Sequence, residues 1–446
     1  MNKKFSKKHL VFMSLGNIIG SGLFLGSSTV LSVAGPAAIV AYLLGGFIMA
    51  LEVMFITEMC VIHPVPGAFR VHASEIFGPW IGFVNGWLFW FSGVLGMASE
   101  VAAAAVFTRF WFPGIPLWAL CILYAVLMTA INLKDVRGLS QIEMVLSSTK
   151  VLALVCFILF GFAVLFGIAP GGTAVLNHPF DSMESFLPNG PRGVFASMIM
   201  VMFSFTGTGI IGLAIADTEN PAKNAPGAIF IINAVVIVLY ALSALFLILL
   251  MPWNKLSPAE SPFVAILNRF QIPFSDSVLN FVVLSAALSG LNSSMYSSSR
   301  MLNSLSRDGQ APAVFLKYNK NGVPVYALIV SSIALLFTAA LSYWLPQKVF
   351  VLLATSSGFL AMFNWLTISV THYYYRKKTL REHPEKLLYK APGYPFTSFL
   401  EAALILGVFA TSPFYAGQVS GLLCGAVLFA SLVVLYFVLR NRKVLR

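Results

Sequence analysis

The most regular feature of the sequence is a series of long apolar stretches separated by short polar segments. As α-helices rising about 1.5 Å per residue, stretches of about 20 residues are long enough to cross a hydrocarbon layer of about 30 Å. Strands of a membrane barrel would instead alternate in polarity at every second residue. The pattern predicts twelve transmembrane helices, at residues 10–34, 37–62, 80–107, 115–133, 140–168, 193–216, 226–250, 277–304, 325–344, 349–373, 396–413 and 417–439.

The composition supports an all-α integral membrane protein. Of the 446 residues, 58% are hydrophobic and only 10% are charged, a balance that an ordinary water-facing surface does not accommodate. The start of the chain has basic residues before an apolar run, as secretory signals do. This run is too long and lacks a small-residue cleavage site, so we expect an uncleaved first helix.

The net charge of +12 is explained by its distribution along the chain. With the N-terminus in the cytoplasm, 22 of the 28 Lys and Arg residues fall in segments on the cytoplasmic side. This asymmetry predicts a multi-pass membrane protein with both termini in the cytoplasm, and no nucleic acid is needed to account for the charge.

The sequence contains few motifs that would indicate a metal site or an enzyme. The four cysteines lie in or at the ends of apolar spans without CxxC spacing, and the six histidines are scattered without an HExxH motif. We therefore predict no metal site, no cofactor and no disulfide framework. The sequence also has no GxxxxGK[ST] loop for ATP and no evident nucleophile with a nearby base, so we expect no enzyme activity.

Glycines crowd the middle of the first span in "SLGNIIGSGLFLGSS", residues 14–28. GxxxG spacing is a common device for close helix packing, which is one interpretation. In the sixth span Gly207 and Gly209 bracket Thr208 much as Gly20 and Gly22 bracket Ser21. Two matching interruptions five spans apart favour inverted repeats with a binding site between them.

We expect one domain, residues 1–446, built from two repeats and two added helices. The repeats would cover about 10–168 and 193–373, with the added helices at about 396–439. Backbone groups freed at the interruptions cannot stay unpaired in hydrocarbon. Half-helix N-termini would receive a carboxylate, and C-termini an ammonium group, which together match a zwitterionic amino acid.

Several motifs resemble those of the bacterial amino acid transporter family, within the amino acid, polyamine and organocation superfamily. They are "GNIIGSGLFLGSS", "FSFTGTGIIGLAIADTENPAKNAPGAI" from 203, "LNFVVLSAALSGLNSSMYSSSRMLNSLSRDGQAP" from 279, "GVPVYAL" at 322 and "YKAPGYP" at 389. The resemblance spans nearly the whole chain. It implies a LeuT-like five-plus-five inverted repeat with broken helices 1 and 6, carrying amino acids inward with protons.

The resemblance also implies a set of substrate-binding residues at the two breaks. Phe203 resembles the aromatic gate that closes over substrate in relatives. The matching positions are Ile19, Gly20, Ser21, Gly22 and Leu23 in the first span, and Phe203, Ser204, Thr206, Gly207 and Thr208 in the sixth.

The chain departs from the family pattern in helix six. Gly209 stands where the family often has an acidic residue, and Asp217 stands where it usually has Glu. Because the first carboxylate is missing, a neutral substrate is the better prediction.

Charged residues inside the spans are candidates for proton coupling. Lys150 lies near the middle of the fifth span, and "EMVLSSTKV" resembles the lysine pattern of proton-coupled relatives. We expect its ammonium to bond to carbonyls of the first break and to Ser293 or Ser294; a purely structural partner is the alternative. Glu100 is a second candidate, with a structural role equally open.

Two further glutamates, Glu52 and Glu58, lie in the second span, and each could relay protons or pair with a buried donor. By the resemblance, we favour a structural role for Glu58.

We therefore predict uptake of a neutral L-amino acid by proton symport with alternating access. An exchanger or an amino acid sensor on the same fold is the alternative. The expected partners are the amino acid, protons and the lipid bilayer, with no nucleic acid and no obligate protein partner.

Overall fold

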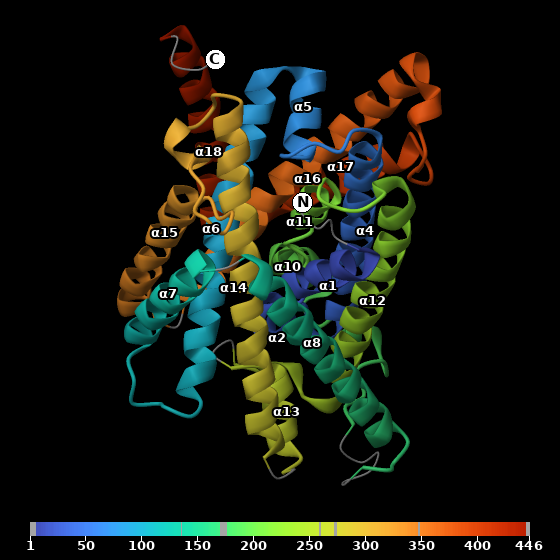
Figure 1. Ribbon diagram of the computed structural model, residues 1–446. Helices are drawn as coiled ribbons and strands as arrows, with labels where there is room; N and C mark the ends of the chain where they lie inside the picture. The colour runs from blue at the N-terminus through green and yellow to red at the C-terminus, as the bar shows by residue number, and fades with distance from the viewer. Residues whose placement is uncertain are drawn as a thin grey trace.

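The computed structural model describes residues 6–134, 136–169, 176–257, 260–271, 274–346 and 348–442. Within these ranges it describes the backbone alone at residues 134, 136–143, 416, 417 and 420. The described residues form helices joined by short connections and contain no β-strand (Figure 1). The α-helices are α1 (Lys7–Ile18), α2 (Ser21–Phe24), α3 (Gly26–Ala34), α4 (Ala38–Ile62), α5 (Phe69–Phe77), α6 (Pro79–Arg109), α7 (Leu117–Lys134), α8 (Val136–Leu165), α9 (Met183–Phe186), α10 (Gly190–Ser204), α11 (Gly209–Ile215), α12 (Pro221–Leu250), α13 (Pro262–Arg269), α14 (Ser275–Arg307), α15 (Val325–Trp344), α16 (Val349–Glu382), α17 (Phe396–Thr411) and α18 (Ala416–Asn441).

The prediction of an all-helical membrane protein is confirmed. In the described residues, ten helical stretches are long and apolar enough to cross a membrane, and Leu117–Leu133 is a shorter apolar helix. One of the ten, Gly26–Ile62, joins α3 to α4 through a 3-10 turn at Gly35–Ala37, so the first and second predicted spans are continuous there. The tenth predicted span is longer than expected, because α16 continues to Glu382.

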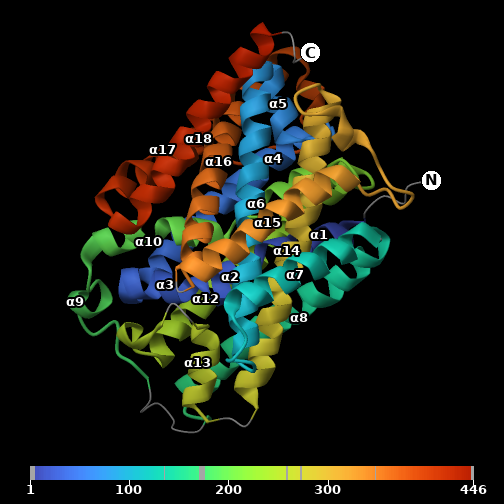
Figure 2. The same ribbon diagram turned by 90° about the vertical axis from the view of Figure 1, so that its left-hand side faces the viewer.

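The centre of the bundle is built on α6, which packs along α14 and α16. The broken segments α1 and α10 lie inside this bundle, where α10 packs against α3, and α1 against α8 and α12. Figure 2 shows α17 and α18 together on one side, next to α16, with which both are in contact. The added C-terminal helices therefore lie outside the core that holds the two breaks.

Three short helices were not predicted from the sequence. In Figure 1, α5 lies at the upper end of the bundle and α13 at the lower end. The ring of Phe263 in α13 is buried against Phe24 and Phe157, with ring centroids 5.3 and 4.7 Å apart. α13 is therefore part of the packed core although its segment lies between two spans. The third, α9, has one turn with Ser182 as its N-cap.

Candidate functional site between two interrupted helices

The first interruption lies at Ile19 and Gly20. α1 ends at Ile18, the next two residues are extended, and α2 begins at Ser21. A Cβ atom on Gly20 would lie 2.5 Å from Oε1 of Glu100, so a larger residue there would displace this carboxylate. The predicted break in the first helix is therefore present, and a carboxylate lies against it.

The second interruption lies between Ser204, where α10 ends, and Gly209, where α11 begins. Gly207 has φ of +98°, in the region that favours glycine. Its carbonyl oxygen accepts a hydrogen bond of 2.8 Å from Nδ2 of Asn17, in the last turn of α1. The two breaks are thus in direct contact.

Tyr240 of α12 connects the ends of both half-helices. Its hydroxyl group lies 3.0 Å from the carbonyl oxygen of Ile18 and 3.0 Å from that of Ser204. These carbonyls have no partner within a continuing helix, because the helices stop there. A buried tyrosine from a third helix therefore lies between backbone acceptors of both breaks, which share its single hydroxyl proton.

Glu100 of α6 occupies the N-terminus of α2. Both carboxylate oxygens lie 3.2 Å from the amide nitrogen of Ser21, which donates to them. The sequence predicted that such amides would receive the carboxylate of a substrate. In this conformation a carboxylate of the protein itself lies there, where the partial positive charge of a helix N-terminus favours it.

Lys150 of α8 is fully buried, and its Nζ donates a hydrogen bond of 2.6 Å to the carbonyl oxygen of Gly16. The expected acceptors were carbonyls of the first break, and Gly16 lies just before that break, in the last turn of α1. Ser294 of α14, the other partner expected for Lys150, has its hydroxyl 3.5 Å from Oδ1 of Asn17. The lysine is thus placed next to the first break, as its proposed coupling role requires.

A cavity lies between the two breaks. Its lining includes the backbone of both breaks, the carboxylate-bearing Glu100, and the aromatic Phe203. Of the predicted binding residues, Gly20, Gly22, Phe203, Ser204, Thr206 and Gly207 line it. Ile19, Ser21 and Leu23 are buried outside this lining, although the amide of Ser21 faces Glu100. The ring of Phe203 packs against Phe350 of α16, with centroids 6.3 Å apart.

A second cavity shares Asn17, Thr206 and Gly207 with the first. It is lined by Thr208 and Gly209, and reaches Glu52 of α4, Trp365 of α16 and the aromatic pair Phe69 and Phe89. Glu52 is fully buried, and neither of its carboxylate oxygens has a hydrogen-bond partner among the described residues.

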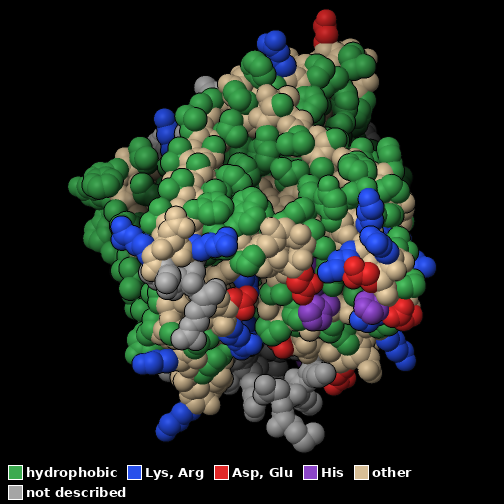
Figure 3. All heavy atoms as spheres, turned by 90° about the horizontal axis from the view of Figure 1, so that it is seen from above, with side chains coloured by type: hydrophobic (Ala, Val, Ile, Leu, Met, Phe, Trp, Pro, Cys, Tyr) green, Lys and Arg blue, Asp and Glu red, His purple; other side chains and the backbone are tan. Residues whose placement is uncertain are grey.

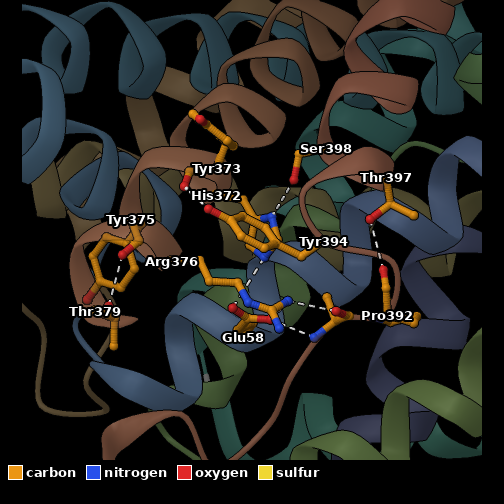
Figure 4. Close-up of polar contacts among 11 residues, drawn as sticks. Glu58, His372, Tyr373, Tyr375, Arg376, Thr379, Pro392, Tyr394, Thr397 and Ser398 are labelled. Carbon is orange, nitrogen blue, oxygen red and sulfur yellow. Dashed lines mark hydrogen bonds and ion pairs between the residues drawn. The ribbon is translucent and has the colours of Figure 1, made fainter. Parts of the chain in front are cut away.

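Glu58 has the structural surroundings that the sequence favoured. Its Oε1 lies 3.4 Å from Nε2 of His372, and its Oε2 lies 3.3 Å from Nη1 of Arg376, both in α16. Oε2 also accepts from the amide of Ala391. Figure 4 shows these groups converging, with His372 also 2.9 Å from the hydroxyl of Ser398. Glu58 thus joins α4 to α16 and to the segment that leads into α17.

Sequence reasoning missed Asn17 and Tyr240. Asn17 carries a usable signal, because it is a polar side chain inside an apolar span just before the first break, whereas Tyr240 is a single tyrosine in the span 226–250. Sequence reasoning also treated the histidines as scattered, whereas the fold brings His63 and His72 together with Glu75.

A polar cavity between two interrupted helices in an all-helical membrane bundle is the arrangement of a secondary transporter, in which broken helices form the substrate site. The sequence model of the amino acid permease family matches residues 9–442. The chain therefore belongs to the amino acid permease family, and it is a multi-pass membrane transporter rather than an enzyme.

Curated relatives cover almost all of the chain. It is 35% identical to the gamma-aminobutyric acid permease of Bacillus subtilis over 444 residues, covering 100% of this chain and 95% of that protein. It is 34% identical to the amino-acid permease RocC of the same organism, covering 95% and 92% of the two chains. It is 34% identical to the aromatic amino acid transport protein AroP of Salmonella typhimurium, covering 91% and 90%.

Proposed function

We propose that this protein takes up a neutral amino acid together with a proton, by alternating access around the two breaks. The observation that carries the proposal is the placement of the Glu100 carboxylate on the amide of Ser21. Substrate would bind between Gly20 and Gly22 on one side and Ser204, Thr206 and Gly207 on the other, with Phe203 closing over it and with Ile19, Ser21, Leu23 and Thr208 supporting the binding backbone.

Competition between the substrate carboxylate and Glu100 for the N-terminus of α2 would couple substrate binding to protonation of Glu100. A substrate carboxylate arriving at the amides of α2 meets the carboxylate of Glu100, and two like charges there repel each other. A proton on Glu100 removes this repulsion and frees the amide of Ser21 for the substrate. Because linkage is reciprocal, a proton that strengthens substrate binding is itself bound more tightly when substrate is present.

Lys150 would act on the other side of the same break. Its ammonium holds the carbonyl oxygen of Gly16, and a charge-assisted hydrogen bond of this kind is stronger than a neutral one. Loss of the proton from Lys150 would weaken the link between α1 and α8 and allow the two helices to separate.

Two observations support a substrate without net charge. Gly209 leaves helix α11 without a carboxylate at its first position. Among the relatives, the names of two specify gamma-aminobutyric acid and aromatic amino acids, which carry no net charge near neutral pH.

The orientation is part of the proposal. The excess of Lys and Arg on the side of the N-terminus supports cytoplasmic termini in the bacterial cell membrane. The division into inverted repeats at about 10–168 and 193–373 is likewise proposed, and it is supported by a break in the first helix of each repeat.

The test is uptake of radiolabelled neutral amino acids into proteoliposomes, after a thermal-shift screen has identified a substrate. We expect accumulation when the inside is alkaline, and a membrane potential of 100 mV to support about 50-fold accumulation per proton. Lys150→Met and Glu100→Gln should abolish pH-driven accumulation. The control is Lys255→Met, which changes an exposed lysine in the connection after α12.

The alternatives give different results in the same vesicles. Counterflow of substrate that ignores the pH gradient would show an exchanger, and binding without flux would show a sensor. Full pH-driven accumulation by Lys150→Met and Glu100→Gln would refute the coupling roles of these residues.

A further inference from the structure

A cluster of metal-binding side chains lies at the end of the bundle that carries α5, away from the transport site. His63 directly follows α4 as its C-cap, and His72 and Glu75 lie three positions apart in α5, on one face of that helix. One possible ligand atom from each of the three residues lies within 4.8 Å of the others. Figure 3 looks onto this end of the molecule, where histidine, acidic and basic side chains lie close together on the surface.

His72 is the distinctive member of this cluster. Its side chain is fully buried, and neither ring nitrogen has a hydrogen-bond partner among the described residues. The ring lies 5.9 Å from that of His63 and 5.1 Å from that of Tyr375 in α16. A buried polar group without a partner is destabilising, so the site favours a ligand that satisfies it.

The surroundings keep His72 in the form that binds metals. Burial, with a smaller contribution from His63, lowers the pKa of His72 to about 3, so the ring is neutral at physiological pH. A neutral imidazole has a free lone pair on one nitrogen, and metal ligation requires that form.

We propose that His63, His72 and Glu75 bind a divalent transition-metal ion of the Zn²⁺ type. Two imidazole nitrogens and one carboxylate oxygen are a common set of three protein ligands for Zn²⁺, with water in the fourth position. Mg²⁺ and Ca²⁺ prefer oxygen ligands throughout, so they fit the site less well.

The exposed members of the site can adjust to the ion. Half of the His63 side chain and about a third of that of Glu75 are exposed, and these two are already paired, with Nδ1 and Oε1 3.1 Å apart. Metal–ligand distances near 2 Å require the donor atoms of His63 and Glu75, which already lie 3.1 Å apart, to approach that of His72. His63 and Glu75 can rotate toward the fixed ring of His72.

An ion bound there would restrain the transport cycle, a consequence that rests on the family assignment. The site would join the end of α4 to α5. The first residue of α5, Phe69, lines the second cavity and packs against Phe89, with centroids 5.3 Å apart. Holding α5 in place would hold Phe69 over this cavity, so the ion should slow transport.

The experiment is a Zn²⁺ titration of the full-length, untagged protein in detergent, stripped with a chelator and followed by a competing fluorescent chelator. We expect one bound equivalent, and a loss of affinity of more than about tenfold in His72→Ala. The control is His178→Ala, because His178 is an exposed histidine with an acidic residue, Asp181, 4.0 Å away. Unchanged binding by His72→Ala, or no binding by the wild type, would overturn the proposal.

Two further variants test the site without changing a buried residue, in case His72→Ala does not fold. His63→Ala and Glu75→Gln change exposed side chains, and each should also weaken Zn²⁺ and reduce the rise in Tm that Zn²⁺ gives the wild type. If both variants bind Zn²⁺ as the wild type does, the site is refuted even where His72→Ala does not fold. Inhibition of uptake by Zn²⁺ is measured separately, so a failure of the transport proposal leaves the binding result intact.

Discussion

At the scale of single residues, the site is held together by side chains that bind main-chain groups. The hydroxyl of Tyr240 lies within hydrogen-bond distance of a carbonyl at each break, and the ammonium of Lys150 donates to the carbonyl of Gly16. The carboxylate of Glu100 accepts a hydrogen bond from the amide of Ser21. Backbone groups released from a helix need such partners inside a membrane protein. The sequence identified Lys150 and Glu100 because charges in apolar spans stand out. It did not identify Tyr240, because one tyrosine in an apolar span is compatible with simple packing.

Tyr240→Phe removes the hydroxyl group, and the two buried carbonyls lose the one donor that they share. We expect a destabilisation of about 1 to 3 kcal/mol and weaker substrate binding, because the ends of α1 and α10 lose their common anchor. The measurements are Tm and equilibrium binding of the purified protein. Tyr343→Phe, at an exposed position in α15, should change neither quantity. Equal behaviour of the two variants would contradict the anchoring role.

At the scale of elements, the two broken helices were predictable and the short connecting helices were not. Glycines near Ser21 and Thr208 mark positions where a helix is easily interrupted, and they recur five spans apart. α13 depends instead on a long-range contact, the burial of Phe263 against Phe24 and Phe157. Its eight residues are too few to form a stable helix by propensity alone, so local sequence could not reveal it.

Gly207→Ala tests whether the break in the sixth span must have its observed shape. The residue has positive φ, and an added Cβ would lie 2.7 Å from the carbonyl oxygen of Asn17. Backbone strain of about 1 to 3 kcal/mol is expected there, together with a loss of substrate binding of at least tenfold. The measurement is binding of labelled substrate to purified protein.

Gly407→Ala is the matched control, because a Cβ at Gly407 in α17 would meet nothing within 4 Å. It should bind substrate as the wild type does. Normal binding by Gly207→Ala would show that the contact between the breaks does not shape the site.

At the scale of the whole molecule, the packing around the transport core depends on buried charges as well as on apolar burial. Glu58, His372 and Arg376 connect α4, α16 and the segment before α17 (Figure 4). The sequence placed Glu58 in a span and favoured a structural role, but it could not supply partners more than 300 positions away. Those partners are defined only by the fold.

Glu58→Gln removes the charge that faces Arg376 and His372. Breaking a buried ion pair leaves its partner uncompensated, and we expect a loss of about 3 to 5 kcal/mol, seen as a lower Tm. Glu385→Gln is the control, because Glu385 also pairs with a histidine, His383, but in an exposed position. That variant should leave Tm unchanged, and similar Tm values for the two variants would contradict the structural role.

The central claim is that an amino acid binds between the two breaks, and a cryo-EM map of the protein with its substrate tests it most directly. The account predicts density between Gly20 and Gly22 of the first break and Ser204 to Gly207 of the second. The carboxylate of the substrate should lie at the N-terminus of α2, with Glu100 withdrawn from the amide of Ser21. Substrate density elsewhere, or helices that run unbroken through both positions, would contradict the account.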